Sequence, residues 1–476
     1  MPTWFRKTLR SAKRVFNSLA SAFILTVASA AGQELQLDPH QQLARDLFQE
    51  LIEINTVESE GTAPAAEAMA RRLLEAGFPP EDVHIVGPND RKVNLVARLR
   101  GRDTGRAPIL LLAHLDVVEA LRSDWTIDPW TFTEADGYYY GRGVRDDKDE
   151  AAIYTANLIR YKEEGFVPDR DIIVALTADE EGGPENGVAW LLENRRDLID
   201  AEYAFNEGGG GFLKDGIRQL NAVQASEKVY QDFTLLATNS GGHSSLPRDD
   251  NAIYDVARAL VRIGQHRFPV MLNEVTQAYF RGTAAVEGGD VAEDILSVLA
   301  DPLDEGAVYR LQAFPHLNAR LRTTCVATRL SGGHADNALP QTAGALVNCR
   351  ILPNHSPARV LLTLRELAGP RVEITPVAEP NPSPPSPLTP SLLGVIERIT
   401  EEMWPGVPVV PVMSTGATDG LYLRRAGIPT YGVSGLFGDV DDNRAHGQDE
   451  RILIESFYEG QEFLYRLVKA LSGTIS

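Results

Sequence analysis

The sequence predicts an α/β fold with two domains. The larger domain has a mixed, mostly parallel sheet flanked by helices, and a smaller α+β domain is inserted into it. Three observations lead to this prediction. At 476 residues, the chain exceeds the size of one ordinary compact core. Short apolar segments alternate with helical segments in its first half. Near Val229 the pattern changes to strands with one exposed face.

The first half of the chain contains the elements of the parallel sheet. Leucine and isoleucine recur at helical spacing in residues 41–54, and good helix formers fill residues 65–74. Further along, we expect buried strands at residues 93–99, 109–112 and 172–176, and a helix at residues 150–161. In such sheets, ligands bind beyond the carboxyl ends of the strands. Polar residues that follow these strands are therefore the first candidates for a functional site.

The inserted domain is predicted from a change of pattern. Residues 230–240 alternate like a half-exposed strand, a helix is expected at 252–263, and another strand at 343–352. A proline-rich connector, residues 376–390, marks the exit. A helix at 391–403 then resumes the larger domain. We therefore assign residues 36–228 and 380–476 to a discontinuous larger domain and residues 229–379 to the insertion.

The first thirty residues are typical of a cleaved secretory signal. Five basic residues and no acid precede an apolar stretch, residues 15–30, which ends in Ala28-Ser29-Ala30. The alternative is an uncleaved membrane anchor. No later segment has eighteen uninterrupted apolar residues, so we expect an exported protein, periplasmic or secreted, without a membrane span after signal removal.

The net charge limits the partners. Loss of residues 1–30 removes five positive charges and changes the net charge from −20 to −25. Such an acidic protein argues against nucleic acid or an anionic membrane as a partner. The two cysteines, Cys325 and Cys349, belong to no CxxC metal pattern. They could pair in an oxidising compartment, but two separate buried thiols are at least as consistent with the sequence.

Two groups of candidate residues follow predicted strands. His114 comes just after the strand at 109–112, with Asp116 two residues on to fix its tautomer. Glu180 and Glu181 follow the strand at 172–176, in a run of three acids. Three acids at the end of a buried strand are electrostatically costly unless cations neutralise them. Taken alone, each group could also be a structural histidine or a solvated loop.

Three more candidates lie in glycine-containing loops. Asp146 stands in GRGVRDDK, which fails as a dinucleotide fingerprint because an anion occupies the third glycine position. Glu207 stands in NEGG and His446 in AHG. Two histidines, one aspartate and two glutamates from five loops, without thiolates, suit two zinc ions that share a carboxylate. The chain has neither an HExxH motif nor a GxSxG nucleophile elbow, which disfavours zincins and serine hydrolases.

The order of these motifs resembles the M20 family of zinc peptidases, a zinc exopeptidase-like fold with a lid domain. The matching segments run from residue 113 to residue 451: AHLDVV (113–118), GRGVRDDK (141–148), ADEEGG (178–183), NEGG (206–209), GGHSSLP (241–247), NALPQTAGALVNCRILP (337–353), GATDG (416–420) and AHGQDER (445–451). The NEGGG and GGHSSLP stretches are most similar to the branch of carboxypeptidase S and N-fatty-acyl-amino-acid hydrolases.

The resemblance implies a role for each metal ligand. Asp146 would bridge two zinc ions, for which Co²⁺ or Mn²⁺ are possible substitutes. His114 and Glu207 would complete one site, and Glu181 and His446 the other. The Asp146–Asp147 peptide bond is often cis in this family.

Other residues would act on the substrate. Asp116 would orient His114, and Glu180 would be the general base for a hydroxide held by the metals. His243, acting from the partner subunit of a homodimer formed through the lid, would stabilise the oxyanion. Arg350 and Asn337 would hold the substrate carboxylate.

The implied reaction is hydrolysis of an amide bond next to a free carboxylate, in a peptide or an N-acyl-amino acid. Glu207 favours the carboxypeptidase and aminoacylase branch, because dipeptidases more often have aspartate there. The alternatives are a dipeptidase of the same family and a catalytically silent, metal-stabilised binding protein.

Two features depart from the family pattern. Leu421 stands where many relatives carry an arginine, so a second carboxylate clamp is missing. The insertion also has extra sequence around residues 270–325, which is expected to cap the pocket or alter dimer contacts.

Overall fold

A computed structural model describes residues 36–103 and 105–473. The proposed signal sequence lies outside these residues. Among the helices described, none combines the length and apolar character needed to cross a membrane.

The largest element is a mixed ten-stranded sheet, whose central strands β6, β3, β7 and β17 are joined by parallel pairs. The α/β class expected from the sequence is confirmed. Its strands are β1 (Val83–Val86), β2 (Asn94–Leu99), β3 (Ile109–His114), β6 (Ile172–Thr177), β7 (Tyr203–Asn206), β8 (Gly211–Lys214), β9 (Ile217–Glu227), β16 (Val409–Ser414), β17 (Thr430–Gly432) and β18 (Phe437–Asp439).

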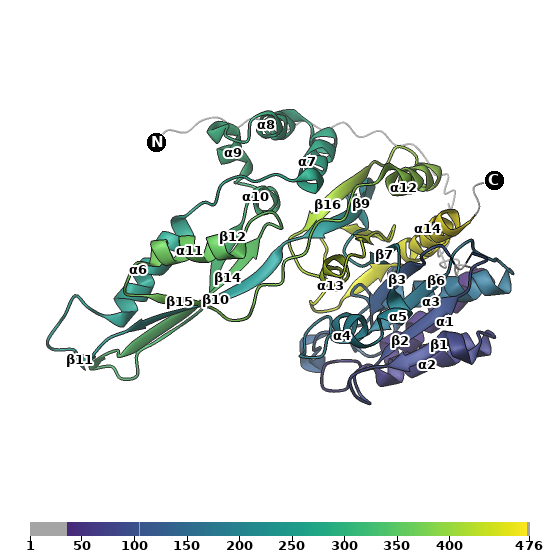
Figure 1. Ribbon diagram of the computed structural model, residues 1–476, viewed down its shortest axis with the longest axis horizontal. Coiled ribbons are helices and arrows are strands. Elements are labelled where there is room, and N and C mark those ends of the chain that lie inside the picture. Colours follow the sequence, from purple (N-terminus) through teal and green to yellow (C-terminus); the bar gives the residue numbers. More distant parts are fainter. Residues whose placement is uncertain (1–35, 104, 474–476) are drawn as a thin grey trace, which may run out of the picture. The chain divides into compact units, whose positions relative to one another are not determined.

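Helices flank the large sheet (Figure 1). They are α1 (Pro39–Glu53), α2 (Ala63–Glu75), α3 (Lys148–Glu163), α4 (Gly187–Asn194), α5 (Arg196–Ile199), α12 (Pro390–Met403), α13 (Gly420–Arg425) and α14 (Ile454–Ser472), with 3₁₀ turns at Pro80–Asp82 and Arg122–Asp124. Helix α1 begins with a capping box, in which the Asp38 side chain accepts from the backbone of Gln41. Helices α4, α5 and α13 share an apolar core with β3 and β6. Strands β3 and β6 are buried along their whole length, as their continuous apolar sequences predict.

A second, four-stranded antiparallel sheet has the order β12-β14-β10-β15. Its strands are β10 (Val229–Thr238), β12 (Thr324–Gly332), β14 (Thr342–Ile351) and β15 (Glu373–Pro376). Helices α6 (Ala252–Gln265) and α11 (Pro357–Ala368) pack on one face of it (Figure 1). A short pair, β11 (Gly242–His243) with β13 (Ala338–Leu339), extends beyond the ends of β10 and β14. A three-stranded sheet is formed by β4 (Thr133–Ala135), β5 (Tyr138–Tyr140) and β19 (Arg451–Leu453).

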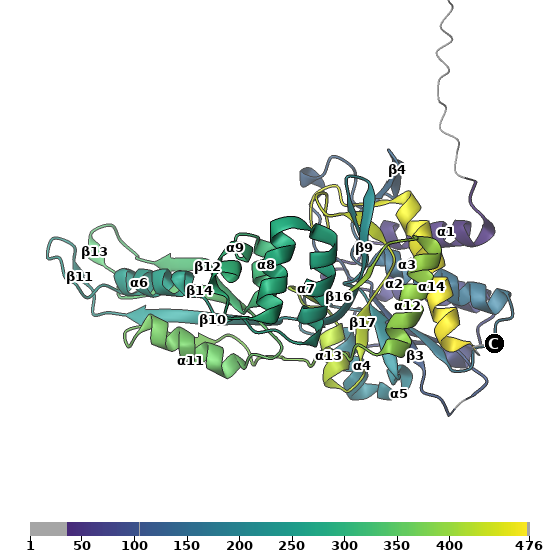
Figure 2. The same ribbon diagram turned by 90° about the horizontal axis from the view of Figure 1, so that it is seen from above.

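The extra sequence near residues 270–325 forms four helices: α7 (Glu274–Glu287), α8 (Gly289–Ala300), α9 (Glu305–Leu311) and α10 (Pro315–Leu321). Their apolar side chains share one core with Val410 and Val412 of β16 and with Leu220 and Ala222 of β9. Figure 2 shows α7 beside β16. This segment therefore packs on the large sheet, although it lies inside the range 229–379. The boundaries at 228/229 and 379/380 stay predictions.

Cys325 and Cys349 form a disulfide, and they stand directly opposite each other on β12 and β14. The sequence left this pairing open, with separate thiols at least as consistent. The bond lies in the core of the small sheet, where Cys349 is fully buried.

Reduction of this disulfide is expected to lower the free energy of unfolding by about 3 kcal/mol, because the bond restricts the unfolded chain. It closes a loop with a sequence separation of 24 residues. The measurement is urea unfolding with and without a phosphine reductant. The double variant Cys325→Ala, Cys349→Ala is the control, since its unfolding midpoint should not respond to the reductant. An unchanged midpoint for the wild type would contradict the disulfide.

Candidate metal centre

The five predicted ligands lie at one edge of the large sheet. His114 is the last residue of β3, Glu181 follows β6, and Glu207 follows β7. These three strands are neighbours and parallel, so their carboxyl ends meet at the same edge. Asp146 lies just before α3, and His446 lies in the loop that leads to β19.

Ligand atoms of these residues form two groups. In the first, His114, Asp146 and Glu207 each offer an atom within 4.8 Å of the others. Asp146, Glu181 and His446 form the second group by the same measure. Asp146 is common to both: its Oδ1 lies 2.9 Å from His114 Nε2, and its Oδ2 lies 3.1 Å from His446 Nε2. Each group holds the residues that the family resemblance assigns to one ion.

The charges in this cluster suit bound cations. Burial, together with the charges of Glu180 and Asp146, raises the pKa of Glu207 well above its usual value. The Glu207 Oε1 atom is enclosed and has no hydrogen-bond partner among the described residues. Such an orphaned carboxylate oxygen is costly in a folded protein. A divalent cation would satisfy it, and two imidazoles with three carboxylates are donors that zinc accepts.

The two histidines interact strongly with Asp146. Burial alone would raise the pKa of Asp146, but hydrogen bonds from His114 and His446 lower it below its usual value. Hydrogen bonds to Asp146 and Glu181 raise the pKa of His446 to about 10. His446 adopts a left-handed backbone conformation, with φ of 62°. The peptide bond between Asp146 and Asp147 is cis, as the resemblance implied.

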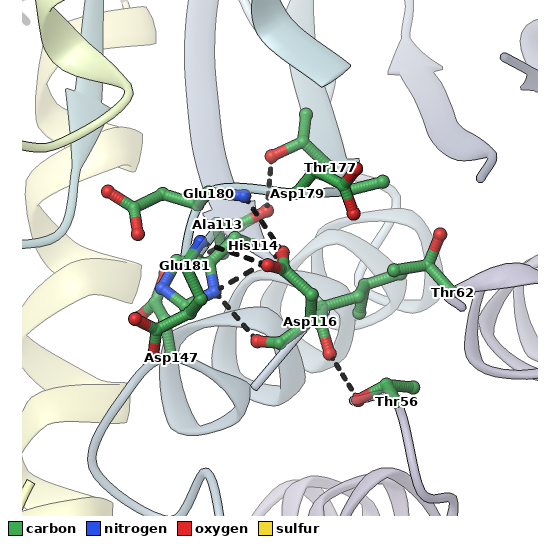
Figure 3. A network of polar contacts seen from close by, with 12 residues as sticks. Thr56, Thr62, Ala113, His114, Asp116, Asp147, Thr177, Asp179, Glu180 and Glu181 are labelled. Atoms are coloured by element: carbon green, nitrogen blue, oxygen red, sulfur yellow. Dashed lines mark hydrogen bonds and ion pairs between the residues drawn. The ribbon is translucent and has the colours of Figure 1, made fainter. Parts of the chain in front are cut away.

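Asp116 contacts His114, the residue it is expected to orient, through its backbone rather than through its carboxylate. The backbone oxygen of Asp116, 2.9 Å away, contacts Nδ1 of His114, while the nearer carboxylate oxygen is 3.7 Å away. The Asp116 carboxylate instead accepts hydrogen bonds from the backbone N–H groups of Glu180 and Glu181, at 3.1 and 2.9 Å. Figure 3 shows Asp116 joined by these contacts to both His114 and the acidic loop. Asp116 therefore fixes the position of this loop relative to β3.

The predicted general base, Glu180, extends its side chain away from Asp116 (Figure 3). Burial raises the pKa of the Glu180 carboxyl well above its usual value, although the charge of His114 opposes this. The nearby carboxylates of Asp419 and Glu181 raise it further.

Lys92 is a supporting residue that the sequence did not reveal. Its ammonium group donates to Asp179, and both side chains are buried. Asp179 begins the acidic loop in a left-handed conformation, with φ of 57°. The two residues are 87 positions apart, and Lys92 belongs to no motif. No local signal in the sequence could have found this pair.

Asp419 is a second residue that was missed, although it stands in the quoted GATDG motif. Asn186 Nδ2 donates to its carboxylate at 2.5 Å, and Thr177 Oγ1 donates at 3.2 Å. Asn186 also donates to the backbone oxygen of Asp179. Asp419 therefore ties the loop between β16 and α13 to the acidic loop.

The remaining predicted residues lie in two places: His243 and Asn337 at the short β11–β13 pair, and Arg350 on β14 of the small sheet. His243 is exposed on β11, and the backbone oxygen of Asn337 accepts from the N–H of the next residue, Ser244, at 3.0 Å. Arg350 lies opposite Tyr230, at the other end of the β10–β14 pair. The structure therefore does not bring Arg350 and Asn337 together within one chain. The reason is the long strand that separates them.

Sequence and structure comparisons agree with this arrangement. Peptidase family M20/M25/M40 matches residues 110–470. The N-fatty-acyl-amino acid synthase/hydrolase of Homo sapiens is 28% identical over 391 residues, which cover 78% of this chain and 75% of the relative.

Two solved structures share the fold. An M20 family metallo-carboxypeptidase from Sulfolobus solfataricus has a TM-score of 0.67 at 18% identity, and the match covers 91% of this chain and 99% of that chain. A dinuclear metal-binding M20 peptidase from Bacillus subtilis has a TM-score of 0.58 at 13% identity, and the match covers 92% and 99% of the two chains. The family match spans most of the molecule and includes all five clustered residues, so the chain is an enzyme of peptidase family M20/M25/M40.

Proposed function

We propose that this enzyme hydrolyses an amide bond next to a free carboxylate, as a carboxypeptidase or N-acyl-amino-acid hydrolase. The observation that carries the proposal is the shared position of Asp146, whose two carboxylate oxygens face two separate groups of ligands. Two zinc ions per subunit would occupy these groups, with cobalt or manganese as substitutes. The ions would be held by His114, Asp146, Glu181, Glu207 and His446.

When bound, two such cations activate a water molecule and polarise the substrate carbonyl. Glu180 would accept the proton of the attacking water and pass it to the leaving amine. Its place on the acidic loop is fixed through Asp116 and through the buried Lys92–Asp179 pair. A general base must lie within hydrogen-bond reach of the proton that it abstracts, so a loop held in one position favours this role for Glu180.

Arg350 would bind the carboxylate of the leaving amino acid. Its guanidinium lies 4.6 Å from the centre of the Tyr230 ring, and Nη1 donates to the backbone oxygen of Thr415 at 3.4 Å. The other donors of its planar fork are available to a carboxylate. Leu421 and Tyr230 line one cavity of about 40 Å³, whose wall also includes Glu227 and Lys228.

His243 and Asn337 would act from the partner subunit of a homodimer. Both belong to the short β11–β13 region, which lies far from Arg350 of the same chain. His243 keeps its Nδ1 within 2.8 Å of Ser245 Oγ, which leaves Nε2 to donate to an oxyanion. Asn337 would then enter the site together with His243.

The disulfide supports export, since such bonds persist in oxidising compartments. An exported enzyme of this kind would meet extracellular or periplasmic peptides or N-acyl-amino acids.

Asp146→Asn is expected to remove both metal ions, because both groups use this carboxylate. Glu207→Gln should remove one ion and leave the other. The measurement for both variants is the metal content per subunit after dialysis, determined by inductively coupled plasma emission spectrometry. Asp124→Asn, at an exposed position, is the control and should keep two ions. If the Asp146→Asn variant retained two ions, Asp146 would not be a ligand common to both groups.

Glu180→Gln should lower kcat by about 10²- to 10⁴-fold, the usual effect of losing a general base, while both metal ions stay bound. The substrates are an N-acyl-amino acid, the same compound with a terminal carboxamide, and an unblocked dipeptide. We expect the blocked, carboxylate-bearing compound to react fastest. Glu193→Gln, on the exposed side of α4, is the matched control. Equal rates for Glu180→Gln and wild type would show that the chain does not use this mechanism, and a faster dipeptide would identify a dipeptidase.

Mixing His243→Ala with Glu180→Gln should restore activity if His243 acts in the partner's site. Random subunit exchange makes half of the dimers mixed, each with one complete site, so recovery should approach about a quarter of the wild-type rate. His243→Ala alone should keep its metal and lose turnover. Turnover that stays low after exchange, with mixed dimers verified by mass spectrometry, would show that His243 does not act across subunits.

A further inference from the structure

A cavity of about 370 Å³ lies beside the metal centre and is unused by the roles described so far. Two of the clustered residues, Asp146 and Glu207, form part of its wall. Tyr138, Phe212 and Phe437 add apolar surface. A group bound here would lie next to a carbonyl held at the metal ions.

Arg145 provides the cavity with a guanidinium that forms no ion pair among the described residues. Its only side-chain hydrogen bond in that part of the chain is a long one, from Nη2 to the backbone oxygen of Leu436 at 3.4 Å. An arginine has five N–H donors, so most of its hydrogen-bonding capacity remains for a ligand. Arg145 is half-buried, which makes an unpaired guanidinium costly unless a ligand or water satisfies it.

Two glycines leave room for this guanidinium. A Cβ atom at Gly438 would lie 3.0 Å from Arg145 Nη2, and a Cβ at Gly210 would lie 3.9 Å from the same atom. Gly210 belongs to the glycine run after Glu207, and both glycines line the cavity. Any larger residue at 438 would press on the guanidinium in its present position.

The acids on the same wall do not neutralise Arg145 through direct contact. Asp149 is 1% exposed, and its Oδ1 has no hydrogen-bond partner in the described part of the chain. Burial raises the pKa of Asp149 to about 7 and that of Glu150 to about 8, although the nearby charge of Arg145 opposes both shifts.

The cavity lies on the acyl side of the proposed substrate. The two substituents of an amide extend away from the reacting carbonyl in opposite directions. Arg350, proposed to bind the leaving amino acid, does not line this cavity, whereas the metal-centre residues do. The acyl group is therefore the part of the substrate that would enter it.

We propose that this cavity binds the acyl part of the substrate and that Arg145 selects acyl groups ending in a carboxylate. This inference rests on the proposed amide hydrolysis. A long, purely apolar chain would leave the guanidinium desolvated and unpaired, whereas a terminal carboxylate would accept its two-pronged hydrogen bond. Arg145 is thus a specificity-determining residue.

The test compares three N-acyl derivatives of one amino acid, with glutaryl, pentanoyl and 5-aminopentanoyl groups of matched length. For the metal-loaded wild type, kcat/KM for the glutaryl compound should exceed that for the pentanoyl compound by about 10- to 100-fold, the usual gain from a hydrogen bond to a charged group. Arg145→Met should abolish this preference: kcat/KM should fall for the glutaryl compound, which loses its charged contact, and rise for the pentanoyl compound, which no longer desolvates a guanidinium. Arg145→Lys should keep part of it.

The matched control is Arg444→Met. Arg444 also lines the cavity but is paired with Asp442 at 2.8 Å, so its loss should not change the ratio between the glutaryl and pentanoyl compounds. Equal kcat/KM values for these two compounds in the wild type, or a preference for the 5-aminopentanoyl compound, would overturn the assignment of Arg145.

Calorimetric binding of free glutarate and pentanoate separates this inference from the proposed reaction. Each ligand has one carboxylate for the metal ions, and only glutarate has a second one for Arg145. Glutarate should bind the wild type more tightly, and Arg145→Met should remove the difference. If no amide is hydrolysed, the proposed reaction fails while this comparison still decides the role of Arg145. Equal affinities of the wild type for glutarate and pentanoate would overturn the assignment of Arg145.

Discussion

The crowding of negative charge around Asp146 is the constraint on which the site depends. Parallel strands β6, β3 and β7 end at one edge, and their loops direct His114, Glu181 and Glu207 toward a single carboxylate. Without cations, these acids are stable only if some are protonated or bonded to histidines. Asp146 is hydrogen-bonded to both histidines, and burial with the neighbouring charges raises the pKa of Glu207. The sheet thus keeps the ligands together at a cost that bound metal would remove.

Buried ion pairs and hydrogen bonds extend this organisation beyond the ligands. Asp116 accepts from the backbone of the acidic loop, and the Lys92–Asp179 pair fixes the residue at which that loop begins. Both partners of this pair are buried, so removing either would leave an uncompensated charge. The support therefore comes from two separate parts of the chain, around Lys92 and Asp116, and it acts on the loop that carries Glu180.

Much of the site could be predicted from the sequence because each ligand follows an apolar strand or lies in a glycine-containing motif. The buried strands β3 and β6 were recognisable for the same reason: their sequences are continuously apolar. Lys92 could not be found, since a lysine outside any motif is usually exposed and only the fold brings it to Asp179. The cysteine pairing depended on strand register, which places Cys325 opposite Cys349 but is not evident from the spacing of the two residues. The four helices α7–α10 were not predicted from the sequence; their apolar faces pack on β9 and β16, and an effect of this segment on the pocket or the dimer contacts stays a prediction.

The register of β10 and β14 decides how the substrate-binding residues can cooperate. Arg350 pairs with Tyr230 at one end, and Thr342 pairs with Thr238 at the other. At about 3.3 Å per residue, this part of β14 separates Arg350 from the β11–β13 region by about 26 Å. No side chain spans that distance, so His243 and Asn337 cannot meet a carboxylate bound to Arg350 of their own chain. A site that uses all three residues would therefore take His243 and Asn337 from a second copy, so the length of this antiparallel strand pair is the structural reason for proposing a homodimer.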